Sequence, residues 1–358
     1  MKLLEKLCVT PGVPGREERV AKLIQSESKG LFDKFYTDTM GSLIAYRKSR
    51  PLSKSKKKSG KVSGRAGASG GPVKIMLSCH MDQIGFLVRH IDDKGFLRVN
   101  AVGGFDTRNL FARLVTVCTQ GGDLPGVMNP GGKPVHIASP EDRKKVPEIE
   151  ELIVDMGLPG DEVKKLVQIG DMVVIKAPFT EVGNSIVSQC LDNRIACWLA
   201  IRSIENLKHH DCDIYVAFTV QEEVGCRGAG PAAAQIKPDI AITLDTTLCC
   251  DTPGVPSDMA ITVQGKGAGL MVMDSGSITD VKLLEEFEAV AKKKKIKTQR
   301  TILPRGGTDS LAIQRKGEGY RVMTLVCGTR YIHSVTEMIH KDDLFACRDL
   351  LTAYLVQA

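Results

Sequence analysis

Two histidines and five carboxylates stand where apolar runs of the sequence end or where a loop enters a helix. They are His80, Asp82, Asp192, Glu222, Glu223, Asp245 and His333. In open α/β sheets, functional groups gather outside the carboxyl ends of the strands, so we expect these side chains to share one edge of a sheet. Imidazole and carboxylate groups are ligands of one or two divalent transition ions, with imidazole suiting Zn, Co or Ni. The pattern therefore predicts a metal centre.

Two pairs of these residues stand close together in the sequence, and their spacing predicts a different role for each member of the pair. In the His80-x-Asp82 pair, alternation along a strand places both side chains on one face, where the carboxylate can orient the imidazole. The adjacent Glu222 and Glu223 point in different directions, so one can bind a metal while the other handles a proton. Burying both glutamates without a cation would cost several kcal/mol.

Each of these residues alone is more often a structural or solvated group, and the hypothesis depends on their joint placement. Histidines without such a setting are interpreted as structural: His90, His136, His209, His210 and His340. Other catalytic signatures are absent from the sequence, which has no HExxH, no P-loop and no GxGxxG. The string at 67–71 matches GxSxG, but it lies in a low-complexity stretch without the strand–turn–helix that a nucleophile elbow needs.

Apolar runs alternating with helical patterns must position these residues. Strands are predicted at 73–79, 172–176, 214–220, 239–244, 259–263 and 320–326, and helices at 16–29, 192–208, 279–296 and 342–356, with short helices within 147–168 and after 220. Between 84 and 135, short apolar runs alternate with Gly-rich turns, which is typical of a small antiparallel barrel or sandwich. We therefore expect an α/β fold with a mostly parallel sheet flanked by helices and a β-rich domain inserted near 86–175.

Composition and charge narrow the class of protein. The chain has 358 residues, 42% apolar and 25% charged, so it is long enough for two globular domains. Its net charge is +7, but residues 47–65 carry nine Lys/Arg and no acid, which leaves 7 − 9 = −2 for the remainder. The low-complexity stretch 47–72 is expected to be a solvated loop, so the charge does not indicate a nucleic-acid-binding body.

The cysteines and apolar segments bear on the compartment. Eleven cysteines occur without a CxxC pair, which favours a reducing cytosol over a disulfide framework. No apolar run approaches the roughly 18 residues that span a bilayer. Glu5 and Lys6 interrupt the apolar start, so no signal peptide is expected. A cytoplasmic protein that is not in the membrane is predicted.

These residues resemble the M42 family of metallo-aminopeptidases, the tetrahedral or deblocking aminopeptidases that are sometimes labelled endoglucanases. The resemblance covers nearly the whole chain, with its motifs in the same order. The matching stretches are LCVTPGVPGRE near the start, CHMDQIGFLV at 79–88, HIASPEDRKK at 136–145, CLDNRIACW at 190–198, FTVQEEVGCRGA at 218–229, LDTTLCCDTPG at 244–254, PRGGTDS at 304–310 and RYIHSVTEM at 330–338.

The resemblance implies a role for each residue of the predicted centre. His80 and Asp245 would complete one metal site, Glu223 and His333 the other, and Asp192 would bridge two divalent ions, Zn or Co. Glu222 would be the general base that activates a metal-bridging water, and Asp82 would orient His80. The loop with Gly307, Thr308 and Asp309 would line the substrate site. The implied activity is hydrolysis of N-terminal residues from oligopeptides.

The resemblance also implies a domain plan and an assembly. Residues 1–85 and 176–358 would form a zinc-peptidase-like catalytic domain carrying the basic insertion 47–72, and 86–175 a dimerisation domain that builds dimers and twelve-subunit tetrahedral particles. The chain departs from the family at the basic insertion, at Thr246–Thr247, and at Gln83, where Glu is usual.

Two alternatives remain open at this point. An N-acyl deblocking or glycan hydrolase would use the same enzyme class, although a glycosidase needs no histidine ligands. A binding or scaffold protein would use the basic loop on an acidic partner, and its binding would weaken strongly with salt. The sequence leaves open the preferred side chain, the native metal and the size of the oligomer.

Overall fold

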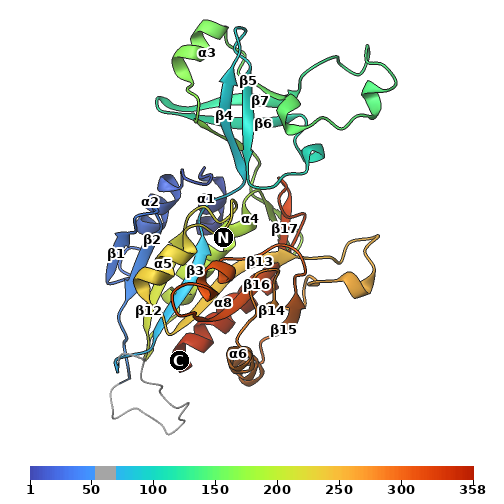
Figure 1. Cartoon of the computed structure of the whole chain (residues 1–358). Helices are drawn as coiled ribbons and strands as arrows, with labels where there is room; N and C mark the ends of the chain where they lie inside the picture. Colours follow the sequence, from blue (N-terminus) through green and yellow to red (C-terminus); the bar gives the residue numbers. More distant parts are fainter. Residues whose placement is uncertain (53–69) are drawn as a thin grey trace.

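The computed structural model describes residues 1–52 and 70–358, so most of the basic insertion 47–72 lies outside the described residues. Figure 1 shows a large α/β body with a small β-barrel at one end, next to the point where the central strand β3 finishes. The predicted α/β class with an inserted barrel is confirmed.

The body is built on one sheet, which has eleven strands in the described part of the chain. Its centre, β12–β3–β13–β16, is parallel, and both margins continue mainly with antiparallel pairs. Along the main path the strands are β1 (Lys34–Thr37), β2 (Leu43–Arg47), β12 (Asp213–Thr219), β3 (Lys74–His80), β13 (Ile240–Leu248), β16 (Arg321–Arg330), β17 (Glu337–His340), β11 (Ser185–Ser188) and β10 (Thr180–Val182). Off this path, β14 (Ala268–Met273) pairs with β16 and with β15 (Thr298–Ile302).

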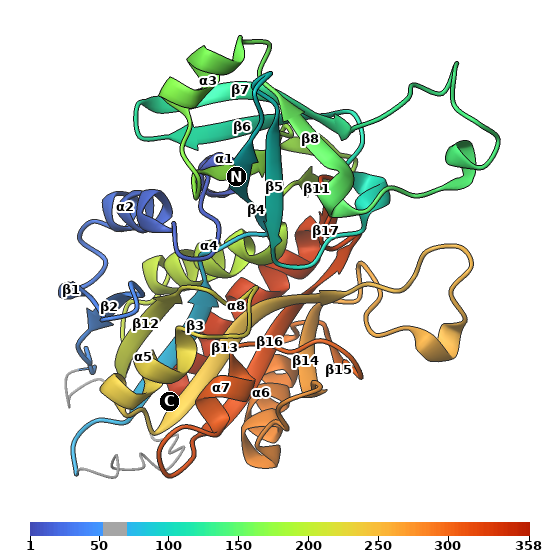
Figure 2. The same ribbon diagram turned by 45° about the horizontal axis from the view of Figure 1, so that its top comes forward.

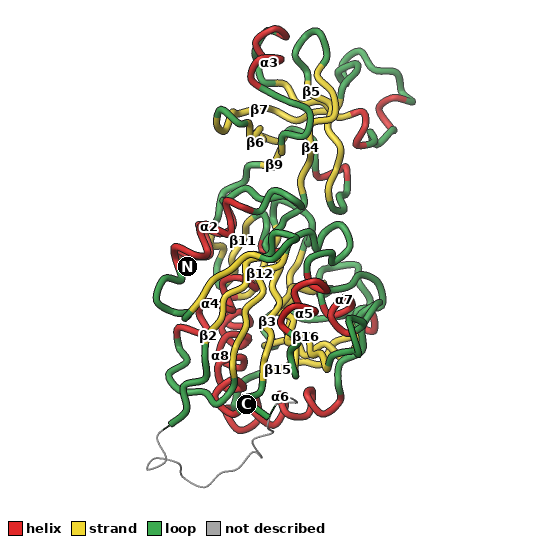
Figure 3. The backbone as a smooth tube through the Cα atoms, turned by 60° about the vertical axis from the view of Figure 1, so that its left-hand side comes forward, coloured by secondary structure: helices red, strands yellow, loops and turns green. Residues whose placement is uncertain are grey.

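Helices cover both faces of the sheet, because its central strands are apolar on both sides. One core joins alternate strand residues such as Ile75 and Leu77 to α1 (Lys2–Val9), α2 (Glu18–Glu27), α4 (Leu191–Glu205), α6 (Val281–Lys294) and α8 (Lys341–Gln357). A second core, with Met76, packs the opposite face on α5 (Ala229–Ile236) and α7 (Ser310–Gln314). Figure 3 shows the sheet between these two layers.

The barrel closes in the order β4–β5–β8–β7–β6–β9. Its strands are β4 (Gly85–Ile91), β5 (Leu97–Val102), β8 (Leu152–Asp155), β7 (Gly122–Pro130), β6 (Arg113–Thr119) and β9 (Met172–Ile175), and α3 (Gly160–Leu166) covers one end. Inward side chains such as Val99, Val117 and Val154 form a core separate from that of the body. Figure 2, with the barrel turned forward, shows β4 at the junction with the body, and Figure 3 shows β9 near the same junction.

One predicted strand is absent, and some strands of the structure were not predicted. The stretch 259–263 is not a strand: a 3-10 turn ends at Met259, and only Thr262 makes an isolated bridge, to Cys249. The strands β14 and β15 were not predicted. The short helices predicted within 147–168 are present as the 3-10 turn Ile149–Glu151 and α3, but the unpredicted strand β8 lies between them, because its apolar side chains fill the barrel. In addition, β13 continues past 244 to Leu248, so Asp245 lies within the strand.

All eleven cysteines are free, and ten of them are buried. This agrees with their interpretation as small core residues. No helix in residues 1–52 and 70–358 combines the length and the apolar character that crossing a membrane requires.

Candidate active site at the edge of the sheet

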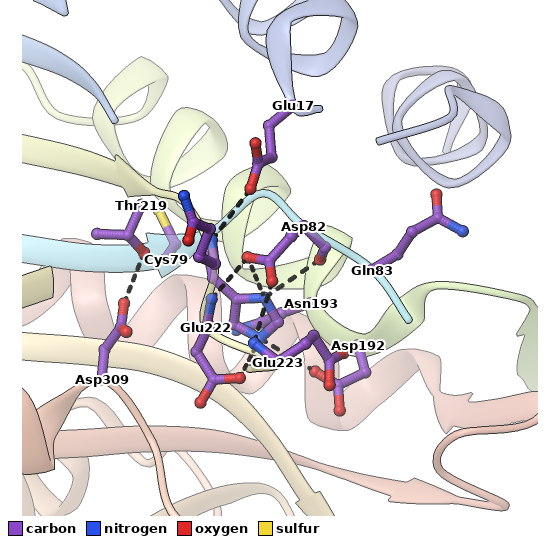
Figure 4. A network of polar contacts seen from close by, with 12 residues as sticks. Glu17, Cys79, Asp82, Gln83, Asp192, Asn193, Thr219, Glu222, Glu223 and Asp309 are labelled. Carbon is purple, nitrogen blue, oxygen red and sulfur yellow. Dashed lines mark hydrogen bonds and ion pairs between the residues drawn. The ribbon is translucent and has the colours of Figure 1, made fainter. Parts of the chain in front are cut away.

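Three parallel strands bring their polar residues to one edge of the sheet. His80 ends β3 and lies opposite Thr219, the last residue of β12. The chain then turns through Gln221, which has a positive φ of 58°, and presents Glu222 and Glu223. Asp245 lies on β13, the other neighbour of β3. These residues therefore lie at one edge of the sheet, and Figure 4 shows Glu222 and Glu223 gathered there with Asp192.

Asp192 lies between the two histidines. It opens α4 in a non-helical conformation, and its peptide bond to Asn193 is cis. Its Oδ1 lies 3.3 Å from Nε2 of His80, and its Oδ2 lies 3.7 Å from Nε2 of His333. One carboxylate thus faces two imidazoles with different oxygens, as a bridging ligand does.

Each half of this arrangement contains one further carboxylate. Asp245 Oδ1 is 3.9 Å from His80 Nε2, and Glu223 Oε2 is 3.3 Å from His333 Nε2. In each triad, His80–Asp192–Asp245 and Asp192–Glu223–His333, the potential ligand atoms lie within 4.8 Å of one another. The structure therefore brings together all five residues that the sequence suggested as metal ligands.

Asp82 connects His80 to the glutamate pair. The ring Nδ1 of His80 lies 3.2 Å from the backbone oxygen of Asp82 and 3.5 Å from its Oδ1. The two carboxylate oxygens of Asp82 accept the backbone N–H groups of Glu222 and Glu223, each at 3.0 Å. Asp82 is fully buried, so it fixes the turn that carries both glutamates as well as contacting the imidazole.

Two supporting residues were missed from the sequence. Glu337 is buried and accepts the backbone N–H of Asp192 through Oε2 and that of His333 through Oε1, both at 2.9 Å. Asn193 donates its side-chain amide to Asp245 Oδ1 at 2.8 Å. The sequence offered a signal for each of them: Glu337 stands four residues after His333, and Asn193 directly follows Asp192.

Glu17 is a third residue that sequence reasoning missed. Its Oε1 accepts the backbone N–H groups of Gly15 at 2.9 Å and Gln221 at 3.0 Å. Figure 4 shows it reaching the turn before Glu222 from the N-terminal segment. Its side chain is buried, and this burial raises the pKa of the carboxyl from 4.5 to about 7.

A cleft of about 480 Å³ opens on this edge. Of the predicted substrate loop, Gly307 and Thr308 line the cleft. Asp309 is buried behind them, and its Oδ2 accepts the hydroxyls of Ser78 and Thr219 at 2.7 and 2.6 Å. We therefore expect Asp309 to act through its neighbours and not by contacting substrate.

The buried charges strongly perturb one another. Burial raises the pKa of Glu222 to about 8; the charge of His80 opposes this shift and that of Glu223 adds to it. Burial also raises the pKa of Asp245 well above its ordinary value. For His333, burial alone would lower the pKa, but hydrogen bonding and charge from Glu223, with the charge of Asp192, raise it to about 10. Without a bound cation, the carboxylates of this site carry more negative charge than its two imidazoles can neutralise.

The donor set fits a pair of divalent cations. Two imidazoles and three carboxylates are ligands that Zn²⁺ and Co²⁺ accept. Glu223 Oε1 is buried and has no hydrogen-bond partner among the described residues, which is costly unless a cation binds nearby. The fit thus rests on the ligand chemistry and on this orphaned oxygen.

Gln83, where the chain departs from the family pattern, contacts a buried arginine beside the site and none of the candidate ligands. Gln83 Oε1 accepts a hydrogen bond from Nη2 of Arg194 at 3.1 Å. The fully buried Arg194 also donates to the backbone oxygens of Leu7 and Thr10, at 2.6 and 2.9 Å. This guanidinium therefore ties the N-terminal segment to α4.

A mostly parallel sheet with a histidine–carboxylate cluster at its carboxyl edge defines a candidate metal-dependent hydrolase. The family model described as M42 glutamyl aminopeptidase matches residues 60–350. The chain belongs to this family, and it is a hydrolase of the aminopeptidase type.

Known relatives agree with this assignment. The lysyl aminopeptidase of Pyrococcus furiosus is 31% identical over 349 residues, which cover 96% of this chain and 93% of that protein. A solved aminopeptidase from Desulfurococcus kamchatkensis superposes with a TM-score of 0.89 at 35% identity, covering 100% of this chain and 94% of that one. The TET1 peptidase of Pyrococcus horikoshii, described as assembling into a tetrahedron or a large octahedral shell, has a TM-score of 0.84 at 29% identity, with 100% and 99% coverage.

The buried carboxyl of Glu17 predicts a pH-dependent stability. Because its pKa is raised to about 7, the folded state holds this proton more tightly than the unfolded state does. The free energy of unfolding should therefore fall as the pH rises from about 4.5 to about 7, by roughly 1.4 kcal/mol per unit at most, and then level off. Glu17→Gln removes this contribution.

Urea unfolding of the metal-free protein between pH 4.5 and 8 checks this prediction. As the pH rises across that range, the free energy of unfolding of wild type minus that of Glu17→Gln should fall by up to about 3 kcal/mol. The exposed neighbour provides the control, since Glu18→Gln should follow wild type. Parallel curves for wild type and Glu17→Gln would show that Glu17 is not a titrating buried group.

Proposed function

We propose that the chain is a di-metal aminopeptidase that hydrolyses N-terminal residues from oligopeptides, with Glu222 as the general base. The observation that carries the proposal is the position of Asp192, whose two oxygens face His80 on one side and His333 on the other. A carboxylate in that position can bridge two cations, and family membership makes peptide hydrolysis the expected chemistry.

Two ligand groups would hold the ions. His80 and Asp245 with one oxygen of Asp192 would form the first site, and Glu223 and His333 with the other oxygen the second. When bound, a pair of divalent ions such as Zn²⁺ or Co²⁺ lowers the pKa of water and polarises the peptide carbonyl. Asp82 and Glu337 act as positioning residues, because they hold the backbone N–H groups of residues that carry ligands.

Glu222 is placed to move the proton. Its Oε2 lies 3.8 Å from His80 Nε2, on the ligand side, and its side chain lines the cleft. In the reaction, Glu222 takes the proton of the attacking water and then delivers it to the leaving amine, so the scissile C–N bond breaks as a C–O bond forms.

The cleft suits the end of a peptide chain. Beyond the ligand cluster its wall includes the apolar side chains of Leu248, Leu303 and Leu311, which can receive the side chain of the first residue. The excess of carboxylates at the base can hold a free α-ammonium group. Cleavage would then start at the N-terminus of the substrate.

Glu222→Gln tests the role of the base. The variant should lose at least about a hundredfold in kcat on aminoacyl chromogenic substrates, because general-base catalysis contributes about 10²–10⁴. Its metal content, measured by inductively coupled plasma mass spectrometry, should equal that of wild type, and chelation should abolish wild-type activity until Zn²⁺ or Co²⁺ returns. An exposed glutamate on α4 gives the control, Glu205→Gln. Retained activity in Glu222→Gln would overturn the assignment.

We also propose that 86–175 is a dimerisation domain, attached to a catalytic domain of residues 1–85 and 176–358. Leu114 on β6 and Val127 on β7 lie directly opposite each other in the barrel, and both are exposed, at 60% and 40%. An exposed apolar cross-strand pair is suited to an interface. The related TET1 peptidase is described as assembling into a tetrahedron or an octahedral shell, which supports a homo-oligomer here.

We also propose a cytoplasmic location for the protein. The cysteines of the chain are free thiols, which is typical of a reducing compartment.

Leu114→Asp tests the barrel as an interface. A charge in the middle of the apolar pair should reduce the particle mass measured by multi-angle light scattering. The matched control is Val356→Asp, at a 53% exposed position on α8 of the body, which should keep the wild-type mass. An unchanged mass for Leu114→Asp would place the contact between subunits elsewhere.

A further inference from the structure

Glu222 has a second polar neighbourhood, on the side that faces away from His80. Its Oε1 accepts a hydrogen bond from Sγ of Cys226 at 3.1 Å, whereas its Oε2 faces His80. Asp309 completes this group: Glu222, Cys226 and Asp309 each offer one ligand atom, and these atoms lie within 4.8 Å of one another. This cluster contains none of the five residues assigned above to the metal pair.

One carboxylate oxygen of Asp309 has no hydrogen-bond partner among the described residues. Its Oδ2 accepts two hydroxyls, but its Oδ1 is buried and has no hydrogen-bond partner in residues 1–52 and 70–358. The side chain is only 1% exposed, so water does not readily satisfy this oxygen. A buried carboxylate oxygen without a partner is costly, and a cation beside it would offset that cost.

The thiol can be reached but is not reactive by itself. Cys226 lines the same cleft as Glu222, although only 5% of it is exposed. Burial, with the nearby charges of Glu222 and Asp309, raises the pKa of this thiol far above its usual range. It therefore stays protonated and is a poor nucleophile. A divalent ion reverses this, because it displaces the thiol proton to solvent and binds the thiolate.

We propose that Glu222, Cys226 and Asp309 form a third, inhibitory site for a thiophilic divalent cation such as Zn²⁺ or Cd²⁺. One sulfur and two carboxylate oxygens are a ligand set that such ions accept. The ion replaces the Cys226 proton, which leaves to solvent, and it engages the carboxylate that serves as the base. Inhibition rests on the function proposed for Glu222, whereas binding does not. The site fills after the paired sites, since an ion that binds there must first displace the thiol proton.

Cadmium provides a readout that is independent of activity. Cd²⁺ bound to a thiolate has an ultraviolet charge-transfer band, and the paired sites contain no cysteine, so exchange of ions there gives no such band. Enzyme already loaded with two equivalents of Zn²⁺ is titrated with Cd²⁺ while absorbance and hydrolysis are both recorded. In wild type, the band should grow to one equivalent as activity falls at least tenfold over the same concentrations.

Two cysteine variants and one control assign the signal. Cys226→Ala and Cys226→Ser should both lack the charge-transfer band. Over the same cadmium concentrations, each variant should keep the activity that it has before cadmium is added. Serine is the second choice in case alanine disturbs the fold, because its hydroxyl can still donate to Glu222. The matched control is Cys250→Ala, which removes a more exposed cysteine outside the cleft lining and should behave as wild type.

The outcomes separate this proposal from the proposed function. A band that persists in both Cys226 variants, or is absent from wild type, would overturn the site. A band without loss of activity would overturn its inhibitory role. If the loaded protein hydrolyses no aminoacyl substrate, the function proposed for Glu222 fails, yet the band still decides whether the cation site exists.

Discussion

Mutual repulsion among buried carboxylates is the constraint on which the rest of this structure depends. Asp192, Glu222 and Asp245 lie within 4 Å of His80, and Glu223 lies 3.3 Å from His333. Burial raises the pKa of Glu222, Glu223 and Asp245, so it disfavours their charged forms. Two imidazoles cannot neutralise four carboxylates, so the cluster favours the binding of cations. Hydrogen bonds from neighbouring residues keep these carboxylates in position. Asp82 and Glu337 accept backbone N–H groups of the residues around the site, and Asn193 donates its side-chain amide to Asp245.

The fold supplies this cluster from elements far apart in the sequence. Parallel pairing of β12, β3 and β13 aligns their carboxyl ends, so short loops after each strand meet at one edge. The barrel is inserted in the chain between β3 and β10, and its loop residue Phe105 lines a hollow together with Asp192 and His333. The inserted domain thus contributes to one wall of the site.

The sequence predicted the site better than it predicted the sheet's margins. His80, Asp192 and His333 could be found because ligand chemistry restricts the residue types and because family motifs surround them. The strands β14 and β15 were missed, since a short apolar run such as 268–273 differs little from 259–263 until its neighbours β16 and β15 are known. Glu337 was missed because its partners are backbone N–H groups, which leave no pattern in side-chain types.

The central claim is that Asp192 bridges two cations held by the two histidine–carboxylate groups. Anomalous diffraction from crystals of the protein loaded with Zn²⁺, recorded on both sides of the zinc absorption edge, tests it most directly. The account predicts two peaks that both contact Asp192, one next to His80 and Asp245 and the other next to Glu223 and His333. A single peak, or two peaks of which only one contacts Asp192, would contradict it.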